Sequence, residues 1–170
     1  LQKNNLKEFK VAVWLNQDIA PVNQEVQNRV NAVAKTISDA GGEVNFEARP
    51  DYDIYKAMDV YGSLLHPSMA SRSTDKEFQK LQSAAEKLDP DDLSESAYTL
   101  RKQVSTLRDY NIANNERTHL RWAWHDFFKT YDALIAPIMA TEAIPHDHGK
   151  YGERTIMVDN DERPYFEQIF

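Results

Sequence analysis

The stretch FKVAVWL, residues 9–15, decides the fold of this chain. Its β-branched and aromatic residues, followed by the polar residues 16–18, predict a short buried strand that ends in a loop. Apolar residues then recur at spacings of three and four over residues 22–40, which predicts a helix with one apolar face. Glycines at 41–42 supply the left-handed stop that such a helix needs, and residues 43–46 return to an extended apolar pattern. A strand, a helix and a second strand in this order predict a βαβ unit with parallel strands.

The middle of the chain, residues 51–131, has helical spacing almost throughout. A first helix is expected to begin after Asp53, its N-cap, and to end at His66-Pro67, where proline breaks the pattern. A polar loop follows, and Asp75 is expected to cap the next helix. The remaining helical stretch, from about residue 93 to residue 131, would measure roughly 55 Å as a single rod, so we expect a break near residues 109–111.

The last part of the chain is expected to form a strand, a loop and a second strand. The first strand comprises the apolar residues before Pro137, and the second comprises residues 155–158. A turn at residues 159–161 follows, and Pro164 is expected to begin a helix.

No shift in composition marks a domain boundary, so we expect a single segment over residues 1–170. Within it, residues 1–50 form the βαβ part, residues 51–131 the helical part and residues 132–170 the strand-loop-strand part. The predicted fold class is α/β, with helices packed on a small mixed, mainly parallel sheet.

Composition excludes several classes of protein. The 20 Lys and Arg residues are outnumbered by 27 Asp and Glu residues, and no basic run concentrates them, so nucleic-acid binding is not the expected activity. The absence of cysteine excludes a disulfide framework, a thiolate nucleophile and a Cys-ligated zinc. No apolar run approaches the ~18 residues that span a bilayer. We expect a soluble, cytoplasmic protein, and its start without Met suggests a piece of a longer chain.

Serine chemistry has two local candidates. Ser63 follows Tyr61-Gly62 inside a helical pattern, whereas a serine nucleophile needs presentation on a tight turn. The loop residues Ser68, Ser71 and Ser73 stand near Lys76, as in a Ser/Lys site, but no Gly-rich turn accompanies them. No complete catalytic constellation is visible in these residues.

Metal and acid-base chemistry have weaker signals. His146-Asp147-His148 offers imidazole and carboxylate groups, which are metal ligands. The two histidines could share one face, but a third ligand would have to come from elsewhere, so a solvated loop and no metal are expected. A metal hydrolase centred on His146 and His148 is kept as an alternative function. The acidic residues at predicted helix starts are interpreted as N-caps; they are Asp51, Asp53, Asp75 and Asp91. A cluster of Arg117, Arg121, Trp122 and Trp124 is interpreted as a packed aromatic face with a solvated arginine edge.

The last third of the chain carries a series of short motifs in a fixed order. They are Asn115-Glu116-Arg117, Leu120-Arg121-Trp122, Phe127-Phe128, residues 131–137 (YDALIAP), residues 154–158 (RTIMV), Arg163-Pro164-Tyr165 and Gln168-Ile169-Phe170. In this order they resemble the C-terminal half of the amidase signature family. The strand, helix and Gly-Gly stop at the start of the chain agree with that family in kind.

The resemblance implies one fold and one chemistry. Members build a large mixed sheet flanked by helices, and they hydrolyse amide bonds through a Ser, cis-Ser, Lys triad without metal or cofactor. The triad belongs to a Gly/Ser-rich segment, and no Gly-Gly-Ser-Ser-Gly occurs here, so no triad residue is assigned. By resemblance, Pro137, Ile138, Met139 and Ala140 form part of the wall of the acyl pocket; the alternative is a loop that covers the sheet edge. Asp132 and Arg154 match strand-leading residues of the family and are expected to be structural.

We therefore expect the C-terminal portion of an amidase-family hydrolase, inactive alone, whose intact form binds a small amide. It is expected to bind neither nucleic acid nor membranes, and to self-associate or expose apolar surface as an isolated piece. The alternative from a different class is a freestanding, non-catalytic α/β module that binds a ligand or a protein partner.

Overall fold

The computed structural model describes residues 3–165 and divides into two compact units. The sheet unit comprises residues 3–50 and 126–165, and the helical unit comprises residues 51–125.

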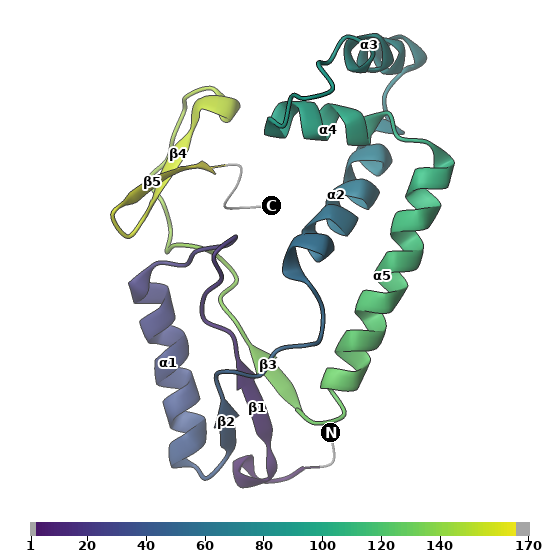
Figure 1. Ribbon diagram of the computed structural model, residues 1–170. Helices are drawn as coiled ribbons and strands as arrows, with labels where there is room; N and C mark the ends of the chain where they lie inside the picture. Colours follow the sequence, from purple (N-terminus) through teal and green to yellow (C-terminus); the bar gives the residue numbers. More distant parts are fainter. Residues whose placement is uncertain (1–2, 166–170) are drawn as a thin grey trace. The chain divides into compact units, whose positions relative to one another are not determined.

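A three-stranded parallel sheet forms the centre of the sheet unit (Figure 1). After a 3-10 turn η1 (Leu6–Glu8), the chain forms β1 (Lys10–Val13), α1 (Gln24–Asp39), β2 (Glu43–Asn45) and, much later, β3 (Ala133–Ile135). The strand order is β2-β1-β3, and β1 pairs in parallel with both neighbours. The predicted βαβ unit and the α/β fold are confirmed.

The core of this unit is the interface between β1 and α1. As the central strand, β1 buries Val11 and Val13, and Val13 is fully buried. Ala34 is the buried residue of α1, and Val30 and Ile37 pack beside it at helical spacing. The short Ala34 side chain lets the helix approach the strand closely.

The stop after α1 is made as its two glycines predict. Gly41 adopts φ +89°, which glycine tolerates best. Gly42 is buried, and a Cβ on it would lie 2.7 Å from Ile37 Cγ2. The chain therefore turns from α1 into β2 with no room for a side chain at this point.

An antiparallel hairpin follows the sheet. After a 3-10 turn η2 (Tyr151–Glu153), β4 (Thr155–Val158) pairs with β5 (Asp161–Pro164). Asp159 takes a positive φ of 53° in the turn between them. Pro164 itself ends β5 and pairs with Thr155, so the helix predicted to begin at Pro164 does not include it; Tyr165 is already helical, and residues 166–170 lie outside the described residues.

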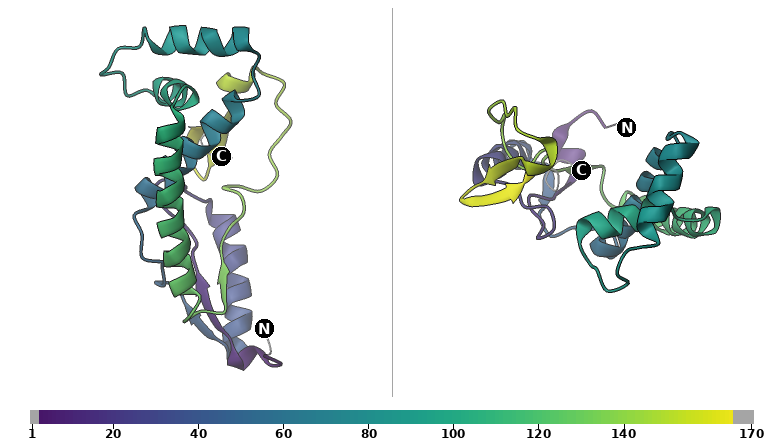
Figure 2. Two further views of the ribbon diagram at one scale, coloured as in Figure 1. Left: turned by 90° about the vertical axis from the view of Figure 1, so that its right-hand side faces the viewer. Right: turned by 90° about the horizontal axis from the view of Figure 1, so that it is seen from above.

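The helical unit consists of α2 (Ile54–Ala70), α3 (Asp75–Ala85), α4 (Glu95–Gln103) and α5 (Leu107–Phe127), whose last two residues belong to the sheet unit. Helix α2 packs on α4, and α4 packs on α3. Figures 1 and 2 show α3 running across α4. No helix within residues 3–165 is long and apolar enough to cross a bilayer.

Three helix boundaries differ from the predictions. Helix α2 continues past Pro67 to Ala70, because proline loses its own N–H but its carbonyl still accepts a hydrogen bond from the Ser71 amide at 2.9 Å. Thr74, not Asp75, caps α3: its hydroxyl accepts from the Glu77 amide while the Glu77 carboxylate accepts from the Thr74 amide.

The break before α5 lies at residues 104–106, not at 109–111. Thr106 and Asp109 explain its position. The Asp109 carboxylate accepts from the Thr106 amide at 3.0 Å, and the Asp109 amide donates to the Thr106 hydroxyl at 3.2 Å. This reciprocal pair starts a new helix, so Asp109 lies in its first turn and cannot be part of the break.

Candidate functional site

The C-terminal ends of the three parallel strands meet at one edge of the sheet, the place where open α/β sheets bind ligands. Arg49, which follows β2, lies over the Trp14 ring, which follows β1, with 4.7 Å between the guanidinium carbon and the ring centroid. Arg49 Nη1 also donates to the carbonyls of Phe46 at 2.9 Å and Ala48 at 2.7 Å. Arg49 therefore ties the ends of β1 and β2 together.

The loop after β3 reaches the same edge and carries the four residues predicted for the acyl pocket. Ile138 is 96% exposed and Met139 is 47% exposed, whereas Ala140 is buried and Pro137 is half-buried. The loop thus presents two large apolar side chains and is anchored by its last residue.

Asn23 holds this loop in place. Its backbone amide donates to the Ala140 carbonyl at 2.8 Å, and its side-chain Nδ2 donates to Glu142 Oε2 at 2.7 Å. Its Oδ1 accepts from the Val26 amide at 3.0 Å and so caps α1. The hydrogen bond from Asn23 lowers the pKa of Glu142. Sequence analysis did not single out Asn23, although an Asn before an amphipathic helix is a capping signal.

The turn of the hairpin is attached to the same helix end. Asp159 Oδ1 accepts from the Gln24 amide at 2.8 Å, at the N-terminus of α1. The positive end of the helix dipole favours a carboxylate there. The start of α1 is therefore the point that joins the loop after β3 to the hairpin.

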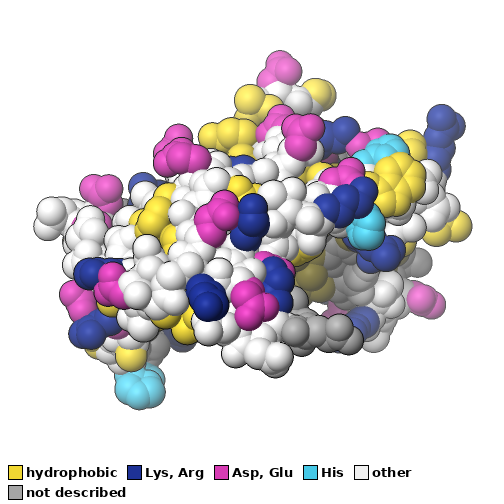
Figure 3. Space-filling model, turned by 90° about the horizontal axis from the view of Figure 1, so that it is seen from below, with side chains coloured by type: hydrophobic (Ala, Val, Ile, Leu, Met, Phe, Trp, Pro, Cys, Tyr) yellow, Lys and Arg dark blue, Asp and Glu magenta, His cyan; other side chains and the backbone are white. Residues whose placement is uncertain are grey.

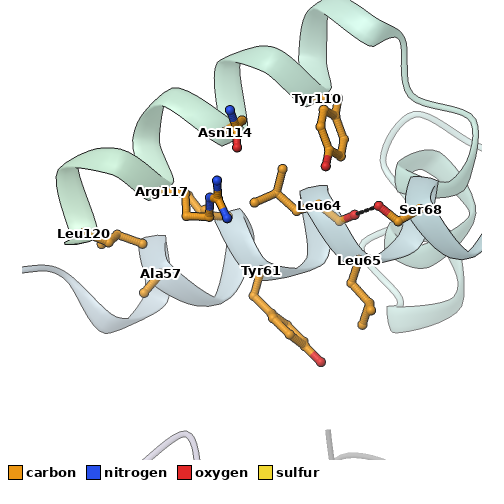
Figure 4. Close-up of a pocket in the computed structure, with 10 residues that line it drawn as sticks. Ala57, Tyr61, Leu64, Leu65, Ser68, Tyr110, Asn114, Arg117 and Leu120 are labelled. Carbon is orange, nitrogen blue, oxygen red and sulfur yellow. Dashed lines mark hydrogen bonds between the residues drawn. The ribbon is translucent and has the colours of Figure 1, made fainter.

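A pocket of about 440 Å³ lies between α2 and α5 in the helical unit (Figure 4). Its lining residues on α2 are Ala57, Val60, Tyr61, Leu64, Leu65 and Ser68, and those on α5 are Tyr110, Asn114, Arg117 and Leu120. The α2 side is mostly apolar, whereas the α5 side carries three polar side chains. Arg117, predicted to lie on a solvated edge, lines this pocket, which no local pattern in the sequence indicates.

The His146-Asp147-His148 motif lies beside a second pocket, of about 610 Å³, in the sheet unit. The pocket is lined by Ala143, Ile144, Pro145, His146, Asp147, Arg154, Thr155, Ile156, Met157 and Tyr165. The His146 and His148 rings are stacked with centroids 6.4 Å apart, and Asp147 accepts from the Gly149 amide at 2.7 Å. Within residues 3–165 no three His, Asp or Glu side chains converge on a common point that suits a metal ion.

A partly exposed polar cluster joins α2 to α4, and it was not predicted from the sequence. Lys102 Nζ donates to Ser63 Oγ at 2.6 Å and to Asp59 Oδ1 at 2.7 Å. The Tyr98 hydroxyl donates to the same Asp59 oxygen at 3.1 Å, and the Lys102 ammonium lies 5.0 Å from the Tyr98 ring centroid. Spacings of four residues, 59 to 63 on α2 and 98 to 102 on α4, put each pair on one helix face. That spacing is the only sequence signal, because the pairing itself is tertiary.

The centre of this cluster is the ion pair between Lys102 and Asp59. Burial acts to raise the pKa of Asp59, but the hydrogen bond and positive charge of Lys102 outweigh it and lower the pKa. Burial and the neighbouring Asp59 charge raise the pKa of Tyr98 above its usual range. Burial lowers the pKa of His66, whose ring meets the Tyr98 ring edge-on at 6.2 Å. Lys102 Nζ donates to both Asp59 and Ser63, so Lys102 is placed as a hydrogen-bond donor and not as a base toward Ser63.

The loop serines do not form the Ser/Lys site considered from the sequence. Ser68 Oγ donates to the Leu64 carbonyl at 2.6 Å, and Ser71 Oγ donates to the Ser68 carbonyl at 2.8 Å. In the described part of the chain no hydrogen bond joins Lys76 to either serine. These hydroxyls serve the end of α2.

The acidic residues predicted as caps have different roles. Asp53 caps α2 and accepts from the Tyr55 amide at 2.8 Å. Asp75 is the first residue of α3, Asp51 lies in a bend, and Asp91 lies in the turn before α4, which Ser94 caps. Only Asp53 of the four is an N-cap, because Thr74 and Ser94 take the other two positions.

Only part of the predicted aromatic face of α5 is packed against other aromatic rings. Trp124 contacts Tyr52 with ring centroids 6.0 Å apart, and Phe127 is buried and stacks on Tyr131 at 4.9 Å. Trp122 is 60% exposed and lies beside His119. The face of the molecule in Figure 3 carries basic and acidic side chains interspersed, with no continuous basic field on it.

Comparison with known proteins gives a family and a fold. The family model described as Amidase matches residues 1–165. No curated protein matches the chain. Among solved structures, a bacterial aryl acylamidase of the amidase signature family superposes with a TM-score of 0.59 at 18% identity, over 97% of this chain and 34% of that one. This chain thus spans about a third of that enzyme's length. It belongs to the amidase family, and its α/β fold is that of a part of an amidase signature enzyme.

Proposed function

We propose that this chain is the C-terminal portion of an amidase-family hydrolase that cleaves small amides, and that it is inactive by itself. In this proposal a Ser, cis-Ser, Lys triad in another segment performs the chemistry. The observation that carries it is the family match over residues 1–165, in a stretch of sequence that contains no Gly/Ser-rich triad segment. The coverage of 34% of the aryl acylamidase leaves room for such a segment in a relative of that length.

The side chains of this chain support an inactive role. Ser63 and Lys102 make the one close Ser-Lys contact that the described residues show, and both sit on regular helices. Lys102 Nζ donates to Asp59 Oδ1 as well as to Ser63 Oγ, so it does not accept the Ser63 proton in this arrangement. A nucleophilic serine also needs backbone donors for an oxyanion, and the helical amides around Ser63 are engaged within α2.

The contribution we propose for this chain is part of the acyl pocket. Ile138 and Met139 stand exposed on the loop after β3, at the sheet edge where this fold class binds ligands. Asn23 fixes the loop at Ala140 and Glu142, so the loop is held while its two apolar side chains remain available. An apolar wall of this kind suits the acyl group of an amide.

The test compares the 170-residue chain with the natural gene product that contains it, using 4-nitroacetanilide and the release of 4-nitroaniline. We expect hydrolysis by the gene product and none above buffer by the chain alone. We also expect the flanking coding sequence to contain a Lys followed by a Gly/Ser-rich segment, and replacement of a serine in it to abolish hydrolysis.

Two results would contradict the proposal. Hydrolysis by the purified chain, lost in a Ser63→Ala variant, would place the chemistry within these residues. A natural reading frame that starts near Leu1 and yields a protein that hydrolyses no amide would favour a freestanding binding module.

A further inference from the structure

The pocket between α2 and α5 has the size and lining of a ligand site. Its volume of 440 Å³ falls within the range of about 300–1,000 Å³ that is usual for small-molecule sites. Val60 is buried in its floor, and Leu64 and Leu65 are half-buried beside it. The α2 side therefore offers an apolar surface to the body of a ligand.

The α5 side carries a row of hydrogen-bond donors. Tyr110, Asn114 and Arg117 are separated by four and three residues, so they lie along one face of the helix, and Figure 4 shows them on the side that borders α2. Within residues 3–165, the side chains of these three residues have no hydrogen-bond or ion-pair partner. A phenol, a carboxamide and a guanidinium thus point toward one apolar groove with their donors available.

The charge of the groove is positive at this row. Glu116, the nearest carboxylate along α5, forms an ion pair with Lys56 of α2 and lies 3.6 Å from the His119 ring nitrogen. The hydrogen bond from Lys56 lowers the pKa of Glu116, so this carboxylate stays ionised and engaged. The charge of Glu116 is therefore matched by Lys56, and the Arg117 charge is left for a ligand.

Two contacts join the helices at one end of the groove. The Lys56–Glu116 pair joins α2 to α5, and in the bend just before α2 the Tyr52 ring contacts Trp124 with centroids 6.0 Å apart. Both contacts lie within the helical unit.

From these observations we propose that the groove between α2 and α5 binds a small organic carboxylate with an apolar body, such as an arylalkanoate. The Arg117 guanidinium pairs with the carboxylate, Tyr110 and Asn114 donate to it, and the hydrocarbon part lies on Val60 and Leu64. Charge complementarity selects an anion, because the row contains three donors and one full positive charge. The apolar α2 wall selects a ligand larger than acetate.

The test is a titration of the full 170-residue chain with 4-phenylbutanoate, followed by two-dimensional amide NMR. We expect saturable shifts that are largest for amides of residues 57–68 and 110–120. The neutral 4-phenylbutan-1-ol is expected to bind at least about tenfold more weakly, because it lacks the charge-assisted hydrogen bond. Acetate is expected to cause no saturable shift at the same concentrations, since it has no apolar body.

Two variants of α5 give a matched comparison. Arg117→Gln removes the charge in the groove and is expected to weaken 4-phenylbutanoate binding by about tenfold or more. Arg108→Gln makes the same change nine residues earlier, on the opposite face of the helix, and is expected to bind as the original chain does. Arg117→Lys keeps the charge but loses the planar fork, and intermediate affinity is expected.

Several outcomes would overturn the proposal. They are absence of saturable binding, equal affinity of the acid and the alcohol, unchanged affinity in Arg117→Gln, and equal losses in both glutamine variants. Shifts of the groove amides that follow protein concentration alone would show that a second copy of the chain covers the groove, which also overturns it. Both arginines are exposed, so the variants are expected to fold.

Discussion

Asp132 and Lys10 exchange a pair of hydrogen bonds where β3 and β1 begin. The Asp132 amide donates to the Lys10 carbonyl at 2.8 Å, and the Lys10 amide donates to Asp132 Oδ2 at 2.8 Å. The Lys3 ammonium donates to the same carboxylate oxygen at 2.5 Å. This arrangement joins segments 122 residues apart and precedes the register that pairs Val11 with Ala133. The structural role expected for Asp132 thus has a direct geometric basis.

The first prediction is a pH dependence of stability that resides in Asp132. The backbone hydrogen bond from Lys10, followed by the hydrogen bond from Lys3, lowers the pKa of Asp132. A carboxyl whose folded pKa lies below its unfolded value stabilises the fold above the unfolded pKa of about 3.9, and this contribution is lost as pH falls through the folded pKa. Urea unfolding at pH 7 and at pH 3 should therefore show a smaller loss in Asp132→Asn than in the original chain.

Asp51→Asn is the control for this prediction. Asp51 is exposed and forms no hydrogen bond through its side chain within the described residues. Its variant should lose as much stability between the two pH values as the original chain does. An equal loss in Asp132→Asn would show that the carboxylate does not contribute through its charge.

The fold could be predicted where local pattern and tertiary packing agree. In β1, α1 and β2 the apolar spacing, the Asn23 cap and the Gly41 stop all favour the same structure. The helix boundaries were wrong where a short-range bond decides between neighbouring residues. Thr74 and Thr106 each form a reciprocal pair with the acid three residues later, and helical spacing alone does not show which polar residue becomes the cap.

The candidate sites could be predicted less well, because they depend on contacts between distant segments. Lys102 and Ser63 are 39 residues apart in sequence, and only the packing of α4 on α2 brings them together. Arg117 lines the groove because α5 borders α2 there, a placement that no local pattern contains. By contrast, the loop after β3 was predicted from a family resemblance, which carries tertiary information that spacing lacks, and its role in the acyl pocket stays a prediction.

The second prediction concerns the contact between Gly62 and Tyr98. A Cβ on Gly62 would lie 2.5 Å from the Tyr98 hydroxyl and 3.1 Å from its ring, and Asp59 and Lys102 hold that ring in place. Ala is the better helix former by about 1 kcal/mol, but overpacking costs about 1–3 kcal/mol. Gly62→Ala is therefore expected to lower the free energy of unfolding by about 1 kcal/mol, measured by urea titration with circular dichroism.

Gly152→Ala provides the matched control, because nothing lies within 4 Å of the position of its Cβ. It should change the free energy of unfolding by less than about 0.5 kcal/mol. A stabilising effect of Gly62→Ala would mean that Tyr98 moves freely and that the cluster between α2 and α4 is loosely held.

The third prediction concerns Arg49 as the tie between β1 and β2. Arg49→Ala removes the contact with Trp14 and the donors to the Phe46 and Ala48 carbonyls. Arg49 is exposed, so solvent screens these interactions and a loss of about 1 kcal/mol in the free energy of unfolding is expected. Arg29→Ala, which removes an ion pair from an 82% exposed side chain, should cost less than about 0.5 kcal/mol. Equal costs would show that Arg49 is only a surface charge.

The fourth prediction is that the isolated chain self-associates. Leu93 is 91% exposed, Leu107 is 75% exposed and Ile138 is 96% exposed, and self-association would remove such apolar side chains from water. Size-exclusion chromatography with light scattering should show an apparent mass that rises with concentration, and a hydrophobic dye should bind. A monomer at every concentration that binds no dye would contradict this expectation.

The fifth prediction tests the pocket wall through Ile138, and it rests on the proposed function. Because Ile138 is 96% exposed, Ile138→Glu should change the free energy of unfolding of the 170-residue chain by less than about 0.5 kcal/mol. In the natural gene product the same change should raise KM for 4-nitroacetanilide about tenfold with a smaller effect on kcat, since a charge would then face the acyl group. Val33→Glu, at a 50% exposed position on α1, should leave both constants unchanged. If Ile138→Glu also leaves KM unchanged, the loop after β3 covers the sheet edge without touching substrate. If both variants lose activity together with stability, the gene product tolerates no charge at either position, and Ile138 has no specific role.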